Sequence, residues 1–245
     1  MRQFGLIGYP LSHSFSKKYF SEKFLREDIA DANYELYPIE RIDIFPSLVA
    51  SLPDLVGINV TIPYKEQVIP YLDALSDVVA ETGACNCIHR IDGKLVGYNT
   101  DVIGFEKSLL KKLNASHQHA LVLGTGGAAK AVHYVLRKLG ISYKEVSRKN
   151  SNGCIAYEQL DTEIIKSHTL IINTTPLGMH PLVDDAPEIP YESLTSAHYL
   201  FDLVYNPAKT LFLAKGEACG AAIENGADML VDQAEASWDI WNGNV

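Results

Sequence analysis

The sequence predicts an α/β fold in two domains, and three observations lead to this prediction. Apolar segments of strand length alternate with amphipathic segments of helix length along most of the chain, which is typical of sheets covered by helices. Residues 120–123 form a continuous apolar run that leads through glycines into a helix expected over 128–139. Residues 85–98 predict a hairpin that turns at Asp92-Gly93, a dipeptide typical of type I′ turns.

The composition argues against several classes of protein. The chain has 245 residues, of which 47% are hydrophobic and 21% charged, so it can bury the core of one large or two smaller domains. A formal net charge of -9 argues against a nucleic-acid groove, and no apolar run reaches the ~18 residues that a membrane span needs. The N-terminus has no signal-peptide layout, and we therefore expect a cytoplasmic protein.

The cysteines and histidines do not predict a metal site. Four scattered cysteines are too few for a disulfide scaffold, and the eight histidines lack the spacing of metal ligands. Cys85 and Cys87 alternate along an expected strand, so their side chains should share one face. We interpret them first as small buried hydrophobes and only second as a metal or redox pair.

The first 100 residues predict one α/β unit. Strands are expected over 3–9, 34–39, 56–62, 85–90 and 94–98, and helices over 17–27, 42–52 and 71–81. The pattern shifts near Asp101, where a helix over 102–112 begins, and we place a domain joint there.

The rest of the chain predicts a second unit built on a doubly wound parallel sheet. Strands are expected over 120–123, 143–147, 170–173, 199–204 and 222–224, and helices over 128–139, 161–167, 210–219 and 228–241. Between the strands after residue 143 no amphipathic segment is long enough for the usual crossover helix, which we expect to be missing or vestigial. Residues 180–190 hold three prolines and predict an exposed loop.

The glycine turn over residues 124–129 predicts a phosphate site in the second unit. Its pattern is G-x-G-G-A-A, placed between a strand and a helix whose N-terminal N–H groups attract an anion. A plain tight turn is the alternative, but this placement favours a dinucleotide. Ser147-Arg148-Lys149 follows the next strand, and its basic residues favour a 2′-phosphate, hence NADP, over a solvated surface pair.

Polar side chains at the strand ends of the first unit predict a substrate site. Ser14 and Ser16 follow the first strand, although a helix cap is the simpler interpretation of either. Asn59 and Thr61 should face one side of the third strand, with Lys65 just beyond Pro63.

Together these motifs resemble one family, the shikimate dehydrogenases and their quinate/shikimate relatives. The resemblance runs from Gly8 to Trp241. It is carried by residues 8–16, 59–66, 83–87, 99–101, 124–129, 173–179, 202–205 and 229–234.

The resemblance implies a fold and an activity. It implies a substrate-binding domain of residues 1–100 plus 228–245, a Rossmann-like NADP-binding domain of residues 101–227, and an active site in the cleft between them. The implied reaction is the reversible, NADPH-dependent reduction of 3-dehydroshikimate to shikimate on the route to chorismate and the aromatic amino acids. The implied enzyme is a monomer or homodimer that binds neither nucleic acid nor membrane.

The resemblance also assigns residues to roles. Lys65 and Asp101 would be catalytic, although Asp101 could instead cap the following helix. Substrate binding would use Ser14, Ser16, Asn59, Thr61, Asn86, Tyr205 and Gln233. Cofactor binding would use Gly124, Thr125, Gly126, Gly127, Ala128, Ser147, Arg148, Lys149, Asn173, Thr174, Thr175, Leu203, Gly226 and Met229.

Two other functions stay open. A quinate or dual quinate/shikimate dehydrogenase is the nearer one, and its frequent use of NAD is disfavoured by the basic pair at Arg148-Lys149. A regulatory protein that binds the ring acid or nucleotide without turnover is the more distant one, and such a protein has no need of both Lys65 and Asp101.

Four departures from the family pattern stand out. Lys149 occupies a position where relatives often have threonine, and Asp228 replaces a common glycine. The crossover helix is expected to be missing, and the usual final helix after Trp241 is expected to be absent or short. None of these departures removes a catalytic residue.

Overall fold

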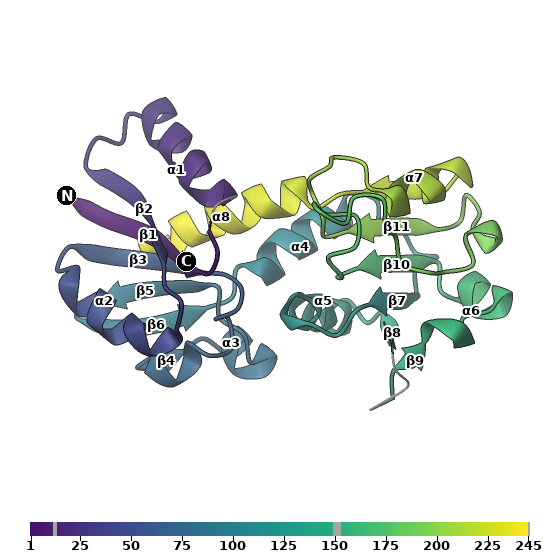
Figure 1. Ribbon diagram of the computed structural model, residues 1–245, viewed down its shortest axis with the longest axis horizontal. Helices are drawn as coiled ribbons and strands as arrows, with labels where there is room; N and C mark the ends of the chain where they lie inside the picture. Colours follow the sequence, from purple (N-terminus) through teal and green to yellow (C-terminus); the bar gives the residue numbers. More distant parts are fainter. Residues whose placement is uncertain (12–13, 149–152, 245) are drawn as a thin grey trace. The chain divides into compact units, whose positions relative to one another are not determined.

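The chain folds into two compact units, described by a computed structural model that covers residues 1–11, 14–148 and 153–244. Unit 1 comprises Met1–Thr100 and Ala234–Val245, and unit 2 comprises Asp101–Gln233 (Figure 1). The joint expected at 228 and the division at 234 both fall within the last helix, α8 (Ala227–Trp241). The assignment of substrate and cofactor to the two domains stays a prediction.

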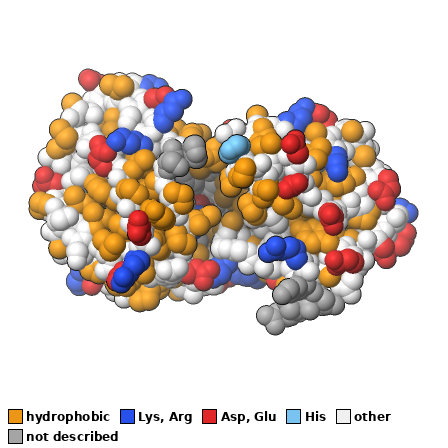
Figure 2. Space-filling model, in the orientation of Figure 1, with side chains coloured by type: hydrophobic (Ala, Val, Ile, Leu, Met, Phe, Trp, Pro, Cys, Tyr) orange, Lys and Arg blue, Asp and Glu red, His pale blue; other side chains and the backbone are white. Residues whose placement is uncertain are grey.

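Within the described part of the chain, no helix combines the length and the apolar character needed to cross a membrane. Figure 2 shows acidic and basic side chains scattered among apolar ones on the face in view.

Unit 1 contains a mixed sheet in the order β2-β1-β3-β5-β6-β4. Its strands are β1 (Arg2–Gly8), β2 (Ala32–Pro38), β3 (Leu55–Val60), β4 (Ala74–Leu75), β5 (Cys87–Ile91) and β6 (Lys94–Tyr98). The first three strands pair in parallel, and β5 runs antiparallel to β3 and β6. Asp92 and Gly93 connect β5 to β6 with positive φ angles of 50° and 79°, so the expected two-residue hairpin is confirmed.

Of the three helices expected in unit 1, only the third is clearly shorter than expected. The helical elements of this unit are α1 (Phe15–Arg26), η1 (Ile42–Ile44), α2 (Phe45–Ser51), η2 (Ile69–Tyr71) and α3 (Asp77–Thr82), with the C-terminal part of α8. The helix expected over 71–81 is confirmed only from Asp77, where α3 begins, and is wrong before it, because β4 occupies residues 74–75. The backbone N–H groups of Asp73 and Ser76 donate to Leu95 and Gly97 of β6 at 2.9 Å each, so pairing with a distant strand replaces the local helix.

The two neighbouring cysteines do not share a face. Both are fully buried, as expected of small hydrophobes, but β5 begins only at Cys87 and Cys85 precedes it. Cys87 packs in the cluster that contains Phe4, whereas Cys85 packs in the separate cluster that contains Ile7. The expectation of one face is wrong because the strand alternation does not extend to Cys85.

Unit 2 contains a sheet in the order β12-β11-β10-β7-β8-β9, in which every described pair of neighbours is parallel. Its strands are β7 (His119–Leu123), β8 (Ser142–Ser147), β9 (Ile155–Ala156), β10 (Leu170–Asn173), β11 (Tyr199–Asp202) and β12 (Ala222–Glu224). Its helical elements are α4 (Asp101–Leu110), α5 (Gly127–Lys138), η3 (Tyr157–Gln159), α6 (Thr162–Ser167), η4 (Tyr191–Ser193), α7 (Leu211–Ala218) and the start of α8. The predicted doubly wound parallel sheet is confirmed.

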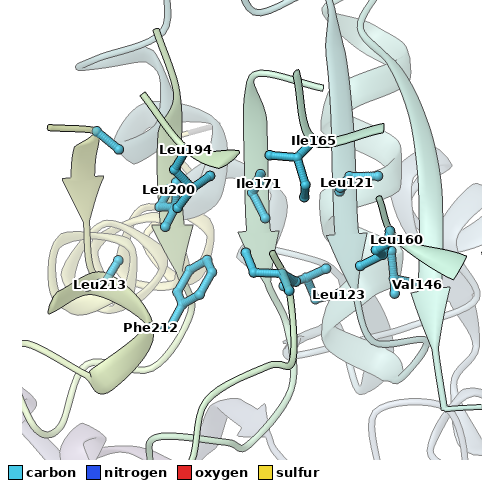
Figure 3. Packing of buried hydrophobic residues seen from close by; sticks show 12 residues of the cluster. Leu121, Leu123, Val146, Leu160, Ile165, Ile171, Leu194, Leu200, Phe212 and Leu213 are labelled. Atoms are coloured by element: carbon cyan, nitrogen blue, oxygen red, sulfur yellow. The ribbon is translucent and has the colours of Figure 1, made fainter. Parts of the chain in front are cut away.

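The core of unit 2 explains its continuous apolar strands. Leu121, Ile171 and Leu200 come from three adjacent strands and lie side by side in one buried cluster, together with Phe212 of α7 (Figure 3). Because helices cover the sheet, the central strands bury residues of both parities and show no alternation.

The connection between β8 and β9 is too short for a crossover helix. The two strands pair in parallel through Val146 with Ile155 and Ser147 with Ala156. Only the seven residues 148–154 join them, whereas a helical crossover needs at least ~10 residues. The predicted loss of this helix is therefore confirmed.

The packing of Trp241 on β3 leads to the first testable prediction. The Trp241 indole N–H donates to the Ile88 carbonyl at 3.0 Å, and a Cβ atom at Gly57 would lie 2.1 Å from the indole nitrogen. We expect Gly57→Ala to displace the indole and to lower the free energy of unfolding by about 1–3 kcal/mol in chemical denaturation.

A double-mutant cycle provides the control for this prediction. The smaller ring of Trp241→Phe should leave room for a methyl group, so the Gly57→Ala, Trp241→Phe double variant should lose less than the sum of the single variants. Additive losses would show that the two residues do not compete for this space.

Candidate active site

Lys65 lies just beyond β3 on a segment that is anchored on both sides. The Tyr64 hydroxyl donates to the buried Ile39 carbonyl at 2.7 Å. The Lys65 carbonyl accepts from the N–H of Cys85 at 2.8 Å, and the Lys65 side chain is half-buried. The backbone that carries the lysine is therefore held beside the segment that precedes β5.

The next residue of that segment, Asn86, holds the end of β6. Its amide oxygen accepts from the Thr100 N–H at 2.7 Å, and its amide N–H donates to the Thr100 hydroxyl at 3.0 Å. Both residues are buried. Because Asp101 follows Thr100 directly as the first residue of α4, the same bonds fix the peptide that leads into Asp101.

Asn59 is engaged at both ends of its amide. Its oxygen accepts from the Tyr34 hydroxyl at 2.8 Å. Its amide N–H groups donate to the Asn86 carbonyl at 3.1 Å and to the Ser237 hydroxyl at 3.0 Å. The Ser237 hydroxyl also lies 3.1 Å from that of Thr100, so one buried network joins β3, the end of β6 and α8.

Sequence reasoning missed Tyr34, Thr100 and Ser237 in this network. Each is at most 1% exposed, and each bonds a residue that the motifs did single out. No local pattern marks them, because their partners lie far away in the sequence. The sequence offered one indication: Ser237 lies on the same face of the last helix as Ala234 and Trp241, which are apolar.

Neither Ser14 nor Ser16 caps helix α1 with its side chain, so the simple capping interpretation is wrong for both. Ser14 occupies the N-cap position of α1 but makes no side-chain capping bond, and its buried hydroxyl has no partner among the described residues. Ser16 lies within the first turn and interacts with the Tyr34 hydroxyl. Thr61 is half-buried just after β3, and its methyl group lies where a Cβ atom at Gly8 would be.

In unit 2, the predicted glycine turn borders a cavity of about 400 Å³. Gly124 needs to be glycine, since its φ is +105° and a Cβ atom would lie 2.8 Å from the Thr174 hydroxyl. Gly126 occupies the N-cap position of α5, where a Cβ atom would meet nothing within 4 Å. The N-terminus of α5 thus faces open space without a side-chain cap or an acidic residue in its first turn.

Several other predicted cofactor residues border the same cavity. Its lining comprises Gly124, Thr125, Gly126, Val146, Ser147, Arg148, Tyr157, Thr174, Thr175, Pro176, Leu177 and Leu182. Gly127 and Ala128 form the first turn of α5 beside it. Lys149 lies outside the described residues.

Asn173 orders the loop at the carboxyl end of β10. Its amide oxygen accepts from the Thr175 N–H at 3.0 Å and from the Thr175 hydroxyl at 2.6 Å. Its amide N–H donates at 2.9 Å to Asp202, which lies directly opposite in the register of β11. Thr174 is held in turn by its hydroxyl, which donates to the Leu123 carbonyl at 2.8 Å.

The remaining predicted residues lie elsewhere in unit 2. A Cβ atom at Gly226 would lie 2.2 Å from the Leu203 carbonyl oxygen, so these two segments touch through backbone. Met229 is half-buried on α8, Gln233 is buried on the same helix, and Tyr205 is half-buried just after β11. Among the residues that the structure describes, no group of three or more His, Cys, Asp or Glu could hold a metal ion.

Comparison with known proteins assigns the chain to a family. The sequence model described as the shikimate dehydrogenase substrate binding domain matches residues 6–88. A shikimate dehydrogenase (NADP(+)) of Clostridium beijerinckii is 39% identical, with 98% of this chain and 92% of the relative covered. The chain belongs to the shikimate dehydrogenase family. The relative from Caldicellulosiruptor bescii, of the same name, is 36% identical over 98% of this chain and 89% of its own length.

The solved structures agree with this assignment. A shikimate 5-dehydrogenase of Thermus thermophilus, in complex with NADP(H) and shikimate, matches with a TM-score of 0.88 at 28% identity. The match covers 99% of this chain and 94% of that one. The two α/β units of this family member are therefore shared with structures of the family.

Asp202 of this family member leads to a prediction about pH. Asp202 is fully buried, and burial raises the pKa of its carboxyl group from 3.8 to about 6, against the lowering effects of Thr210, Val204 and Asn173. Between these two values the folded state binds the proton more tightly than the unfolded state, so rising pH removes stability. The loss between pH 4 and 7 should be on the order of 3 kcal/mol.

Asp202→Asn should remove this dependence. The difference in unfolding free energy between variant and wild type should change by about that amount between pH 4 and 7 and stay constant above pH 7. Chemical denaturation at each pH measures it. Thr210→Ser keeps the hydroxyl that bonds Asp202 and serves as a control that should retain the wild-type pH profile. Parallel profiles for Asp202→Asn and wild type would contradict the assignment.

Proposed function

We propose that this protein is an NADP-dependent shikimate dehydrogenase, which reversibly reduces 3-dehydroshikimate to shikimate on the route to the aromatic amino acids. The observation that carries the proposal is the framework around Asn86. Cys85, the residue before it, bonds the Lys65 backbone, and Asn86 itself holds Thr100, the residue before Asp101. Three residues expected to act on the substrate are thereby tied to one buried framework in a member of this family.

The residues of unit 2 fit NADP. The uncapped N-terminus of α5 offers N–H groups to the pyrophosphate, and the open space at Gly126 leaves room for it. The exposed Arg148 follows β8, at the position where a dinucleotide fold recognises the ribose 2′ substituent. When bound, the nicotinamide supplies the hydride.

Lys65 and Asp101 perform the chemistry on the protein side. The Lys65 ammonium group points at the C3 oxygen of the substrate, neutralises the charge that develops there and transfers the proton. Asp101 orients Lys65 and binds the neighbouring hydroxyl. The prediction that substrate and cofactor meet in a cleft between the two domains stays a prediction.

The neutral polar residues suit a polyhydroxy ring acid. The Ser14 hydroxyl, buried and without a partner in the described chain, is available for the substrate carboxylate together with Ser16 and Tyr205. Thr61, Asn86 and Gln233 complete the set. Such a site rejects analogues that lack a hydroxyl, because its own polar groups would be left unpaired.

Two residues receive a different role from the one expected. The amide groups of Asn59 and Asn173 are both occupied within their own units. We assign Asn59 to the framework that holds Asn86, and Asn173 to the ordering of Thr175 at the cofactor cavity. Both are then positioning residues rather than contacts.

The proposal includes a cellular setting. No cysteine of the chain, all four of which are described, forms a disulfide, which agrees with a reducing compartment such as the cytoplasm. The proposed enzyme acts there on a small molecule, as a monomer or homodimer, without nucleic acid or membrane.

Lys65→Ala should separate catalysis from binding. We expect the turnover number to fall by at least about a hundredfold while KM for shikimate changes little, because the ammonium group acts mainly on the developing charge. Steady-state kinetics measure both. Lys94→Ala, at an exposed position in the β5–β6 hairpin, is the matched control and should behave like wild type. A raised KM with near-normal turnover would refute the role given to Lys65.

The decisive experiment follows the nicotinamide absorbance band with purified protein. Shikimate and quinate are each offered with NADP and with NAD. Reduction of NADP with shikimate, and little with quinate, supports the proposal. Activity with quinate and NAD would instead assign the protein to the dual-substrate enzymes. Thermal stabilisation by ligand without any turnover would favour the regulatory protein.

A further inference from the structure

One residue at the cofactor cavity belongs to none of the motifs. Tyr157 is the first residue of η3 and lines the cavity with Val146, Ser147 and Arg148. It is the only aromatic side chain among the described residues that line this cavity. The roles that we propose for the glycine turn and for the basic residue after β8 do not involve Tyr157.

The short connection after β8 places Tyr157 next to Arg148. In the parallel register, Ser147 pairs with Ala156, so the next residue on each strand, Arg148 and Tyr157, leaves the sheet side by side. A full crossover helix would separate the two positions by many more residues in sequence. Here nine residues along the chain bring Tyr157 to the point where the ribose is expected.

The side chain of Tyr157 lies partly against the core and partly at the cavity. The half-buried side chain packs against the core cluster that contains Val146 and Leu160. Its hydroxyl oxygen is buried and has no hydrogen-bond partner among the described residues. Burial raises the pKa of Tyr157 to about 12, the nearby Arg148 lowers it and Glu188 raises it, so the hydroxyl stays neutral at physiological pH.

The other lining residues fit the same ligand. Val146, Pro176 and Leu177 give this part of the cavity apolar walls, and Arg148 contributes a cation at its edge. A flat aromatic base needs apolar or aromatic surface to pack on, and a phosphate on the adjoining ribose needs a cation. An adenosine 2′-phosphate group supplies both.

We propose that the ring of Tyr157 is the packing surface for the adenine base, next to Arg148, whose binding of the 2′-phosphate already belongs to the proposed function. This inference rests on the proposed function, because it assumes a dinucleotide at the glycine turn. Tyr157 thus sets affinity for the adenosine end of the cofactor, and Arg148 sets the preference for the phosphorylated form.

Calorimetric titration of the full chain with 2′,5′-ADP and with 5′-ADP tests the proposal without turnover. Tyr157→Ala should weaken both nucleotides by a similar factor, about tenfold, because base–aromatic packing is lost for both. Arg148→Ala should weaken 2′,5′-ADP by at least about tenfold and leave 5′-ADP nearly unchanged. Tyr157→Phe keeps the ring and should bind both nucleotides as wild type does.

Two further variants guard the interpretation. Tyr157→Leu fills the same part of the core without an aromatic face, so it should lose nucleotide affinity like Tyr157→Ala even if the alanine variant folds poorly. Lys130→Ala, on α5 but outside the cavity lining, should leave both affinities unchanged. The melting temperature of each variant shows that it is folded.

Several outcomes would overturn the proposal. Unchanged binding in folded Tyr157→Leu would show that the ring meets no ligand, and equal losses in Tyr157→Phe and Tyr157→Ala would assign the contact to the hydroxyl. A loss confined to 2′,5′-ADP in Tyr157→Ala would assign the contact to the phosphate.

Wild type that binds both nucleotides but does not oxidise shikimate would contradict the proposed function alone. Wild type that oxidises shikimate while Tyr157→Leu binds normally would contradict this inference alone.

Discussion

The structure of unit 1 depends on a buried hydrogen-bond network centred on Ser237. That hydroxyl joins Asn59 of β3 to Thr100 at the end of β6, and Asn86 closes the network from the segment before β5. Each member is buried, so removing one partner leaves a polar group unpaired at a cost of about 1–3 kcal/mol. The Lys65 carbonyl is bonded to Cys85, the residue before Asn86, and Asp101 follows Thr100 directly, so the backbone at both proposed catalytic residues is connected to this network.

Unit 2 uses a comparable arrangement at the carboxyl ends of its strands. Asn173 and Asp202 face each other in register and are buried, and Asn173 holds the loop that borders the cavity beside the glycine turn. The hydrogen-bond partners of the buried Asp202 carboxyl group include no cation, so its ionisation is costly. Its pKa is raised for this reason. The loop is thus ordered at the expense of some stability at neutral pH.

The loss of a helix changes what the neighbouring residues can do. In a standard βαβ unit the second and third strands are separated by a helix that covers the sheet. Here β9 follows β8 after seven residues, and Tyr157 and the loop after β10 form part of the wall of the cavity beside the glycine turn. In the binding mode that we propose, this short connection brings Tyr157 to the adenosine end of the cofactor.

The sequence by itself determined the α/β class, most strands, the hairpin at Asp92-Gly93, the glycine turn, the missing crossover helix and the family. The structural features depend on residue periodicity and on turn chemistry, which act over a few neighbouring positions, whereas the family was inferred from the resemblance of its motifs. Only the tertiary structure decided that residues 73–76 pair with β6, that Cys85 and Cys87 pack in different clusters, and that Asn59 is fully bonded. The reason is distance along the chain: Asn59 and Ser237 lie 178 residues apart, and no local pattern records a partner so remote.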